Sequence, residues 1–127
     1  MMKKERLNKN FLDDFQGYDF SIIKENKIFL VGSIRFREYF IKIESILQIL
    51  HEKLVGICSI DGLLNKDKFN EKEWDKLQEI AIRKLNDQDA ILVIDVNSYI
   101  GEQSREEIEY FNLNLKKPVY YLSKLRK

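Results

Sequence analysis

Cysteine is almost absent from this chain of 127 residues, which contains only Cys58. One cysteine forms neither an intramolecular disulfide framework nor a cysteine zinc cluster. Long apolar runs are missing as well. Residues 1–10 lack the apolar stretch of a signal peptide, and no segment approaches the roughly 20 apolar residues that span a bilayer. We therefore expect a cytoplasmic protein with no membrane partner.

An excess of charge of either sign is also missing. The formal net charge is +1 and the isoelectric point is about 7.7. These values give no electrostatic footprint for a nucleic acid polymer or an anionic membrane. A small anionic ligand held by a few local groups is still compatible with them. The hydrophobic fraction of 44% is that of an ordinary globular chain, and the length fits one domain.

Four short apolar segments predict β-strands, at residues 27–31, 54–60, 90–96 and 118–122. Each segment is too short for a typical helix and is rich in β-branched or aromatic residues. The first and third segments are apolar almost continuously, which is typical of strands buried on both faces of a parallel sheet.

Apolar residues recur at helical spacing between these segments, ahead of the second, third and fourth strands. The alternation of strands and helices predicts right-handed βαβ units. We therefore expect an α/β fold over residues 27–127. Its predicted form is a small, doubly wound, Rossmann- or flavodoxin-like parallel sheet of about four strands with flanking helices.

Residues 1–26 lie outside this alternation and form an N-terminal extension. The apolar residues Phe11, Phe15 and Phe20, with Leu12 and Tyr18 between them, predict a short amphipathic helix. It would pack either on the edge of the domain or on a partner.

The loops after the strands are the candidate ligand site, because open parallel sheets bind ligands beyond the carboxyl ends of their strands. Residues 32–35 (GSIR) follow the first strand. The backbone of Gly32, Ser33 and Ile34 could receive an anion, with Arg35 as a bidentate clamp. The alternative is a tight turn with Ser33 as a helix cap and Arg35 in solvent, and spacing alone favours this turn.

The loop after the third strand is longer. Gly101 allows a bend, Ser104 can begin a helix, and Glu107 follows three residues later, which is the spacing of a capping box. The same arrangement brings the Glu107 carboxylate to the mouth of the crevice, where it could attack an anomeric carbon. Local chemistry by itself favours the capping box.

Three further carboxylates are weaker candidates. Asp61 and Asp95 end the second and third strands, where either could bind a ribose hydroxyl or donate a proton, or simply form a turn. Glu102 is either solvated or a second carboxylate of the site. We expect no metal and no cofactor.

Four segments in order resemble the nucleoside 2-deoxyribosyltransferase-like superfamily. They are residues 31–40 (VGSIRFREYF), 89–96 (DAILVIDV), 99–110 (YIGEQSREEIEY) and 117–122 (KPVYYL). The similarity is to its short bacterial and phage members, which are related to deoxynucleoside monophosphate N-glycosidases. It covers residues 27–122, and the third segment is the most specific.

The resemblance implies an enzyme that acts on a deoxynucleoside or its 5′-monophosphate. Glu107 matches the nucleophile that attacks C1′ and expels the base, which is then replaced by another base or by water. The turn from Gly32 to Arg35 matches the part that lines the sugar or 5′-phosphate, and Ser104, in the loop with Gly101 and Glu102, matches a position near the phosphate. Asp61 or Asp95 would orient the sugar. A homodimer or higher homo-oligomer is also implied.

Two positions depart from the pattern of these short relatives. They usually carry Leu-His-x-Arg-Lys-Ile-Asp before the third strand, whereas residues 80–86 read IAIRKLN, so that Ala81 and Asn86 replace a His and an Asp. One alternative is therefore a non-catalytic nucleotide-binding module. Another is an interaction protein in which Glu107 only caps its helix.

Overall fold

The computed structural model describes residues 7–57 and 66–127. The predicted end of the second strand at residues 58–60, Cys58 within it, and the candidate residue Asp61 lie outside the described residues.

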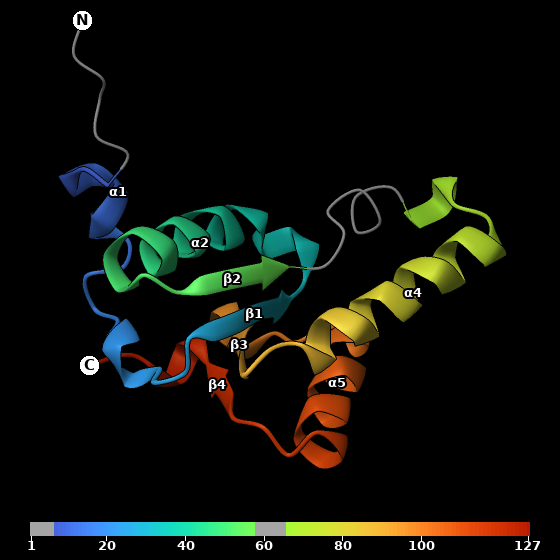
Figure 1. Ribbon diagram of the computed structural model, residues 1–127. Helices are drawn as coiled ribbons and strands as arrows, with labels where there is room; N and C mark the ends of the chain where they lie inside the picture. The colour runs from blue at the N-terminus through green and yellow to red at the C-terminus, as the bar shows by residue number, and fades with distance from the viewer. Residues whose placement is uncertain (1–6, 58–65) are drawn as a thin grey trace, which may run out of the picture.

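The sheet has four parallel strands in the order β2-β1-β3-β4 (Figure 1). The strands are β1 (Lys27–Gly32), β2 (Leu54–Ile57), β3 (Ala90–Ile94) and β4 (Val119–Tyr121). This arrangement confirms the predicted α/β fold with a small parallel sheet. β3 ends two residues earlier than predicted. Asp95 is therefore the first residue after the strand and does not lie within it.

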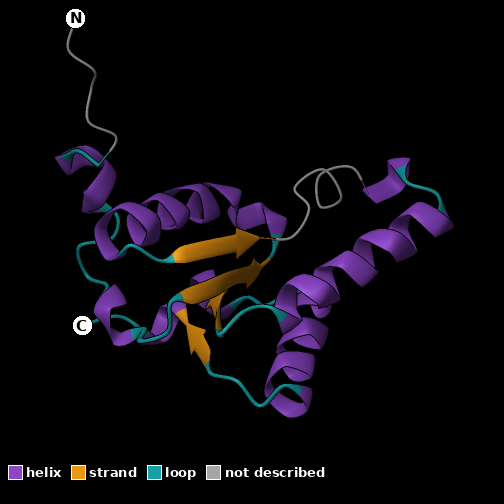
Figure 2. Ribbon diagram, viewed as in Figure 1, coloured by secondary structure: helices purple, strands orange, loops and turns teal. Residues whose placement is uncertain are grey.

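Helices cover both faces of the sheet (Figure 2). α2 (Arg37–His51) packs on one face, and α4 (Glu71–Asn86) and α5 (Glu102–Glu109) pack on the other. α5 continues into a π-helical turn at Tyr110–Asn114. Short 3-10 turns occur at Phe20–Ile22, Ile34–Phe36, Lys66–Lys68, Val96–Ser98 and Leu122–Lys124. No helix in the described ranges is long and apolar enough to cross a membrane.

Strand β1 shows how the sequence pattern produces two cores. Ile28 and Leu30 pack toward α2, while Phe29 and Val31 pack toward α4 and α5. All four side chains are buried, and each contributes roughly 1.5–3 kcal/mol of hydrophobic stabilisation. The unbroken apolar run of β1 is therefore the consequence of having a helix layer on each side.

The N-terminal segment packs on the chain's own domain. It contains α1 (Lys9–Asp13), and Phe15 and Phe20 beyond this helix are buried in the core that α2 shares with the sheet. The backbone N–H of Lys127 donates to the Gly17 carbonyl at 2.8 Å. This hydrogen bond joins the described part of the N-terminal extension to the C-terminal end of the chain.

Candidate functional site

The ends of β1 and β3 form the switch point of the doubly wound sheet. The two strands are neighbours, and Gly32 pairs with Ile94 at their carboxyl ends. The chain then leaves β1 toward α2 on one face and leaves β3 toward α5 on the other. In open parallel sheets ligands bind where the chain diverges in this way, so the predicted crevice is the region between residues 33–36 and 95–101.

Gly32 is required by the close approach of the two strands. A Cβ added there would lie 3.1 Å from both the Cβ and the carbonyl oxygen of Ile94, and 3.3 Å from the ring of Phe40. Ser33 follows as the cap of the short helix, and its Oγ accepts the Arg35 N–H at 3.3 Å. This is the tight turn that spacing favoured, and anion binding by this loop stays a prediction.

An aromatic contact joins the two loops. The Arg35 guanidinium carbon lies 3.8 Å from the centre of the Tyr99 ring, and Phe36 meets the same ring edge-on at 6.0 Å. A cation–π contact of this kind contributes about 0.5–1 kcal/mol at an exposed site. Tyr99 and Phe36 were not predicted as site residues. The available signal was an aromatic residue within a few positions of the carboxyl end of a strand.

The bend after β3 is made by Asn97 and Ser98 and not by Gly101. Asn97 and Ser98 have φ of 54° and 63°, in the left-handed region that ordinary residues rarely occupy. Gly101 has an extended backbone with φ of −70°, and an added Cβ would meet no atom within 4 Å. Gly101 was expected to allow a bend, and the structure makes no use of its conformational freedom.

The predicted capping box of Ser104 and Glu107 is also wrong. α5 begins at Glu102 with Gly101 as its cap residue, and no side chain caps it. Because α5 begins at Glu102, Ser104 and Glu107 lie inside the helix. Ser104 is buried, with 5% of its surface exposed.

The described residues contain a capping box elsewhere, at the start of α4. Asn70 Oδ1 accepts the Glu73 N–H and Glu73 Oε1 accepts the Asn70 N–H, both at 2.9 Å. The Glu73 carboxylate accepts a backbone N–H at the start of its helix. The Glu107 carboxylate has no such capping role.

Glu107 is half-buried, and burial raises the pKa of its carboxyl group to about 7, with the neighbouring Glu106 carboxylate acting in the same direction. Near neutral pH the group is therefore divided between its two forms. The ionised form can act as a nucleophile and the protonated form can donate a proton. Glu102, in the first turn of α5, is exposed.

Asp95 has a clear structural contact. It is 6% exposed, and its two carboxylate oxygens accept the backbone N–H of Ser123 at 2.9 Å and the Ser123 hydroxyl. These bonds tie the end of β3 to the segment after β4. They account for the burial of Asp95 without a ligand, and its predicted role in orienting the sugar is untested.

The two departures from the resembled pattern lie in α4. Ala81 is buried. The Asn86 side-chain amide donates to the Ile82 carbonyl at 2.9 Å and to the Tyr110 hydroxyl at 3.1 Å. Asn86 is the last residue of α4 and lies just before the amino end of β3. The predicted crevice is at the carboxyl end of β3, so Asn86 is at the opposite end of the strand. No group of His, Cys, Asp and Glu suited to a metal ion occurs among the described residues.

Comparison of the chain with protein-family models, curated proteins and solved structures gave no match. The resemblance to the nucleoside 2-deoxyribosyltransferase-like superfamily thus stays a prediction. It depends mainly on residues 31–40 and 99–110, which are the segments that border the crevice.

Proposed function

We propose that this protein binds a nucleoside or nucleotide in the crevice between β1 and β3 and cleaves or transfers its N-glycosidic bond. Glu107 carries the proposal. It is a half-buried carboxyl group whose pKa is about 7, it lies on the helix that leaves the crevice, and it makes no cap. Burying an ionisable group that caps no helix end lowers the stability of the fold. Catalytic groups are often buried at such a cost and have shifted pKa values.

The loops after β1 and β3 offer groups for the sugar and a 5′-phosphate. The face of the Arg35 guanidinium lies on Tyr99, which leaves its N–H edge for a phosphate. Ser33 accepts one hydrogen bond, and its hydroxyl can still donate. Gly32, Ile34, Gly101, Glu102 and Ser104 complete the proposed lining of the site.

The proposed reaction has two balanced steps. The ionised Glu107 carboxylate forms a bond to C1′ while the bond from C1′ to the base nitrogen breaks, and the base leaves with that electron pair and takes a proton from solvent. Water or a second base then attacks C1′ and releases the Glu107 carboxylate. Attack by water gives hydrolysis, and attack by a second base gives transfer.

Release of the base from a nucleoside or nucleotide is the measurement that tests the proposal. Deoxynucleosides and their 5′-monophosphates, alone and with a second free base, are incubated with the protein and analysed by chromatography. We expect released or exchanged base, loss of at least about 100-fold in rate for Glu107→Gln, and little change for the matched control Glu106→Gln. If no substrate of the panel turns over, the enzyme proposal is wrong.

A second candidate is a nucleotide-binding module without catalysis. The observation that favours it is the engagement of both Asp95 oxygens by Ser123, because Asp95 is then a poor donor of a proton to the leaving base. Thermal-shift measurements with the same panel separate the candidates, since a ligand that binds the native state raises Tm. Stabilisation without turnover supports the module, and no stabilisation by any nucleotide contradicts both.

The predicted homodimer and the cytoplasmic location belong to this proposal too. Sedimentation velocity with and without a nucleotide tests the oligomeric state. The expected result is a dimer, and a monomer under both conditions would contradict it.

A further inference from the structure

The outer edge of β2 is open among the described strands. β2 pairs with β1 alone, and the Leu54 N–H donates to the Asn26 carbonyl at 2.9 Å. Backbone groups alternate between the two sides of a parallel strand. Leu54 and Gly56 therefore bond to β1, while Val55 and Ile57 direct their N–H and C=O groups outward. Consistent with this, the Ile57 carbonyl accepts a hydrogen bond from Lys84 of α4 at 3.2 Å.

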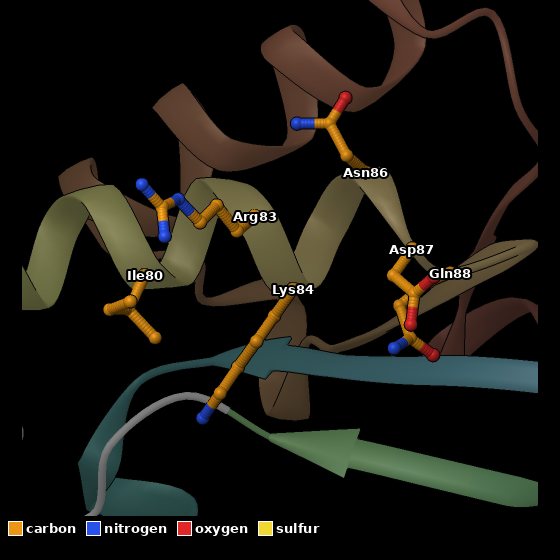
Figure 3. Close-up of a pocket in the computed structure, with 6 residues that line it drawn as sticks. All are labelled: Ile80, Arg83, Lys84, Asn86, Asp87 and Gln88. Carbon is orange, nitrogen blue, oxygen red and sulfur yellow. The ribbon is translucent and has the colours of Figure 1, made fainter.

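A groove follows this edge between β2 and the C-terminal half of α4. It consists of two pockets of about 460 and about 270 Å³ that share Asp87 and Gln88. Ile80, Arg83, Lys84 and Asn86 line the first, and Lys27, Gln48, Leu54, Val55 and Gly56 line the second. In Figure 3, Lys84 extends from α4 toward the end of β2, and Asp87 and Gln88 lie together at the other end of the groove.

The floor of the groove is close to the strand backbone. A Cβ added at Gly56 would lie 3.2 Å from the Phe29 ring and 3.5 Å from the Gln88 amide nitrogen. Leu54 beside it is 58% exposed. An open strand edge with a helix along it is the geometry in which proteins bind an extended peptide as an added strand. Backbone groups then supply affinity, and alternate side chains supply specificity.

The charge of the groove is predominantly positive. Lys27, Arg83 and Lys84 line it, and Asp87 is the one carboxylate among the described residues that line it. Arg83 is paired with Glu79 at 2.7 Å, so Lys27 and Lys84 provide the excess. A second copy of β2 placed on this edge would bring the same net positive charge against it, which is unfavourable. An acidic partner is favoured instead.

We propose that the β2 edge and the groove beside α4 bind an extended acidic peptide segment as a fifth strand. The outward N–H and C=O of Val55 and the outward N–H of Ile57 would bond to its backbone, and the Ile57 carbonyl keeps its hydrogen bond from Lys84. Acidic side chains on the α4 side would meet Lys27 and Lys84, and apolar side chains would lie on the α2 side. This surface is separate from the nucleotide crevice, which lies at the carboxyl ends of β1 and β3.

The test uses an acetylated, amidated hexapeptide of alternating glutamate and valine, with a lysine–valine peptide as its counterpart. Binding to the full chain is measured by fluorescence anisotropy, and the Val55 and Ile57 amides are followed by NMR. The decisive variant is Val55→Pro, which removes an outward N–H without removing a bond to β1. Val55→Ala is the matched control, because it loses side-chain packing but keeps the N–H.

The expected result is binding of the acidic peptide with shifts of both amides, at least tenfold weaker for Val55→Pro and for Lys84→Glu. Val55→Ala and the exposed-site control Lys124→Glu should bind like the original chain. Failure of the acidic peptide to bind, or equal binding of the basic peptide, overturns the proposal. A dimer that sedimentation detects and that Val55→Pro dissociates also overturns it, because a second copy then takes the edge.

Discussion

The two connections that meet at the carboxyl edge of the sheet differ in how far packing explains them. In the turn after β1, Gly32 is dictated by the approach of Ile94, and Ser33 caps the following turn. In the connection after β3, Asn97 and Ser98 adopt left-handed conformations, and α5 then carries the half-buried Glu107 with no capping role. The first loop is explained by structure alone. The second leads into a helix that carries a carboxyl group with a raised pKa, and the proposed function rests on this group.

The largest expected effect is at Glu107. Its pKa is 4.5 in the unfolded reference and about 7 in the fold, so the native state binds the extra proton between these values. The contribution of this group to stability therefore falls as pH rises from about 4.5 to about 7 and is constant above that. Glu107→Gln avoids this loss and should be more stable than the original chain above pH 7, by up to roughly 3 kcal/mol.

Urea unfolding on both sides of this pH window checks the prediction at Glu107. The advantage of Glu107→Gln should shrink to nearly nothing below pH 4.5, where the original carboxyl is protonated in both states. Glu109→Gln, which changes an exposed carboxylate of the same helix, is the control. A pH-independent difference between Glu107→Gln and the original chain would show that the carboxyl is not held near neutrality.

The next largest effect is a difference in stability between alanine substitutions at the two glycines of the site, Gly32 and Gly101. Gly32→Ala places a Cβ 3.1 Å from the Ile94 backbone oxygen, and overpacking of this kind costs about 1–3 kcal/mol. Gly101→Ala meets open space at an ordinary φ, so its stability should change by less than about 1 kcal/mol. Thermal and urea unfolding of the two variants measure the difference. Equal costs would contradict the contrast between the two loops.

A smaller effect is expected where the second connection is anchored. Asp95→Asn replaces one of the two oxygens that accept hydrogen bonds from Ser123, and the loss should be about 1–2 kcal/mol. Ser123→Ala, which removes only the hydroxyl, should cost less. Urea unfolding gives the two costs, and hydrogen exchange should show faster opening after β4. An unchanged Asp95→Asn variant would mean that the anchor does not stabilise the fold.

The smallest effect is at the contact between the loops. Tyr99→Leu removes the ring under Arg35 and should change stability by less than about 1 kcal/mol. A double-mutant cycle with Arg35→Met isolates the pairwise energy. A coupling near zero would show that the two loops are energetically independent in spite of their contact.

The sequence predicted the elements better than it predicted the site. Continuous apolar runs and helical stripes follow directly from burial, so β1, β3, α2 and α4 could be located from them. The capping box could not be assigned in the same way. Ser-x-x-Glu has the correct spacing at Ser104, but the helix had already begun at Glu102, and the true box uses Asn70 and Glu73. Spacing does not fix where a helix starts.

By itself, the sequence determined the alternation of strands and helices, the burial of β1 on both faces, and the expectation that the ligand site lies in the loops after the strands. Only the tertiary structure decided that Arg35 and Phe36 contact Tyr99, that Asp95 is engaged by Ser123, and that the β2 edge borders a cationic groove. The physical reason is range. Burial patterns are written locally along the chain, whereas pKa, hydrogen-bond partners and grooves depend on groups that only the folded chain brings together.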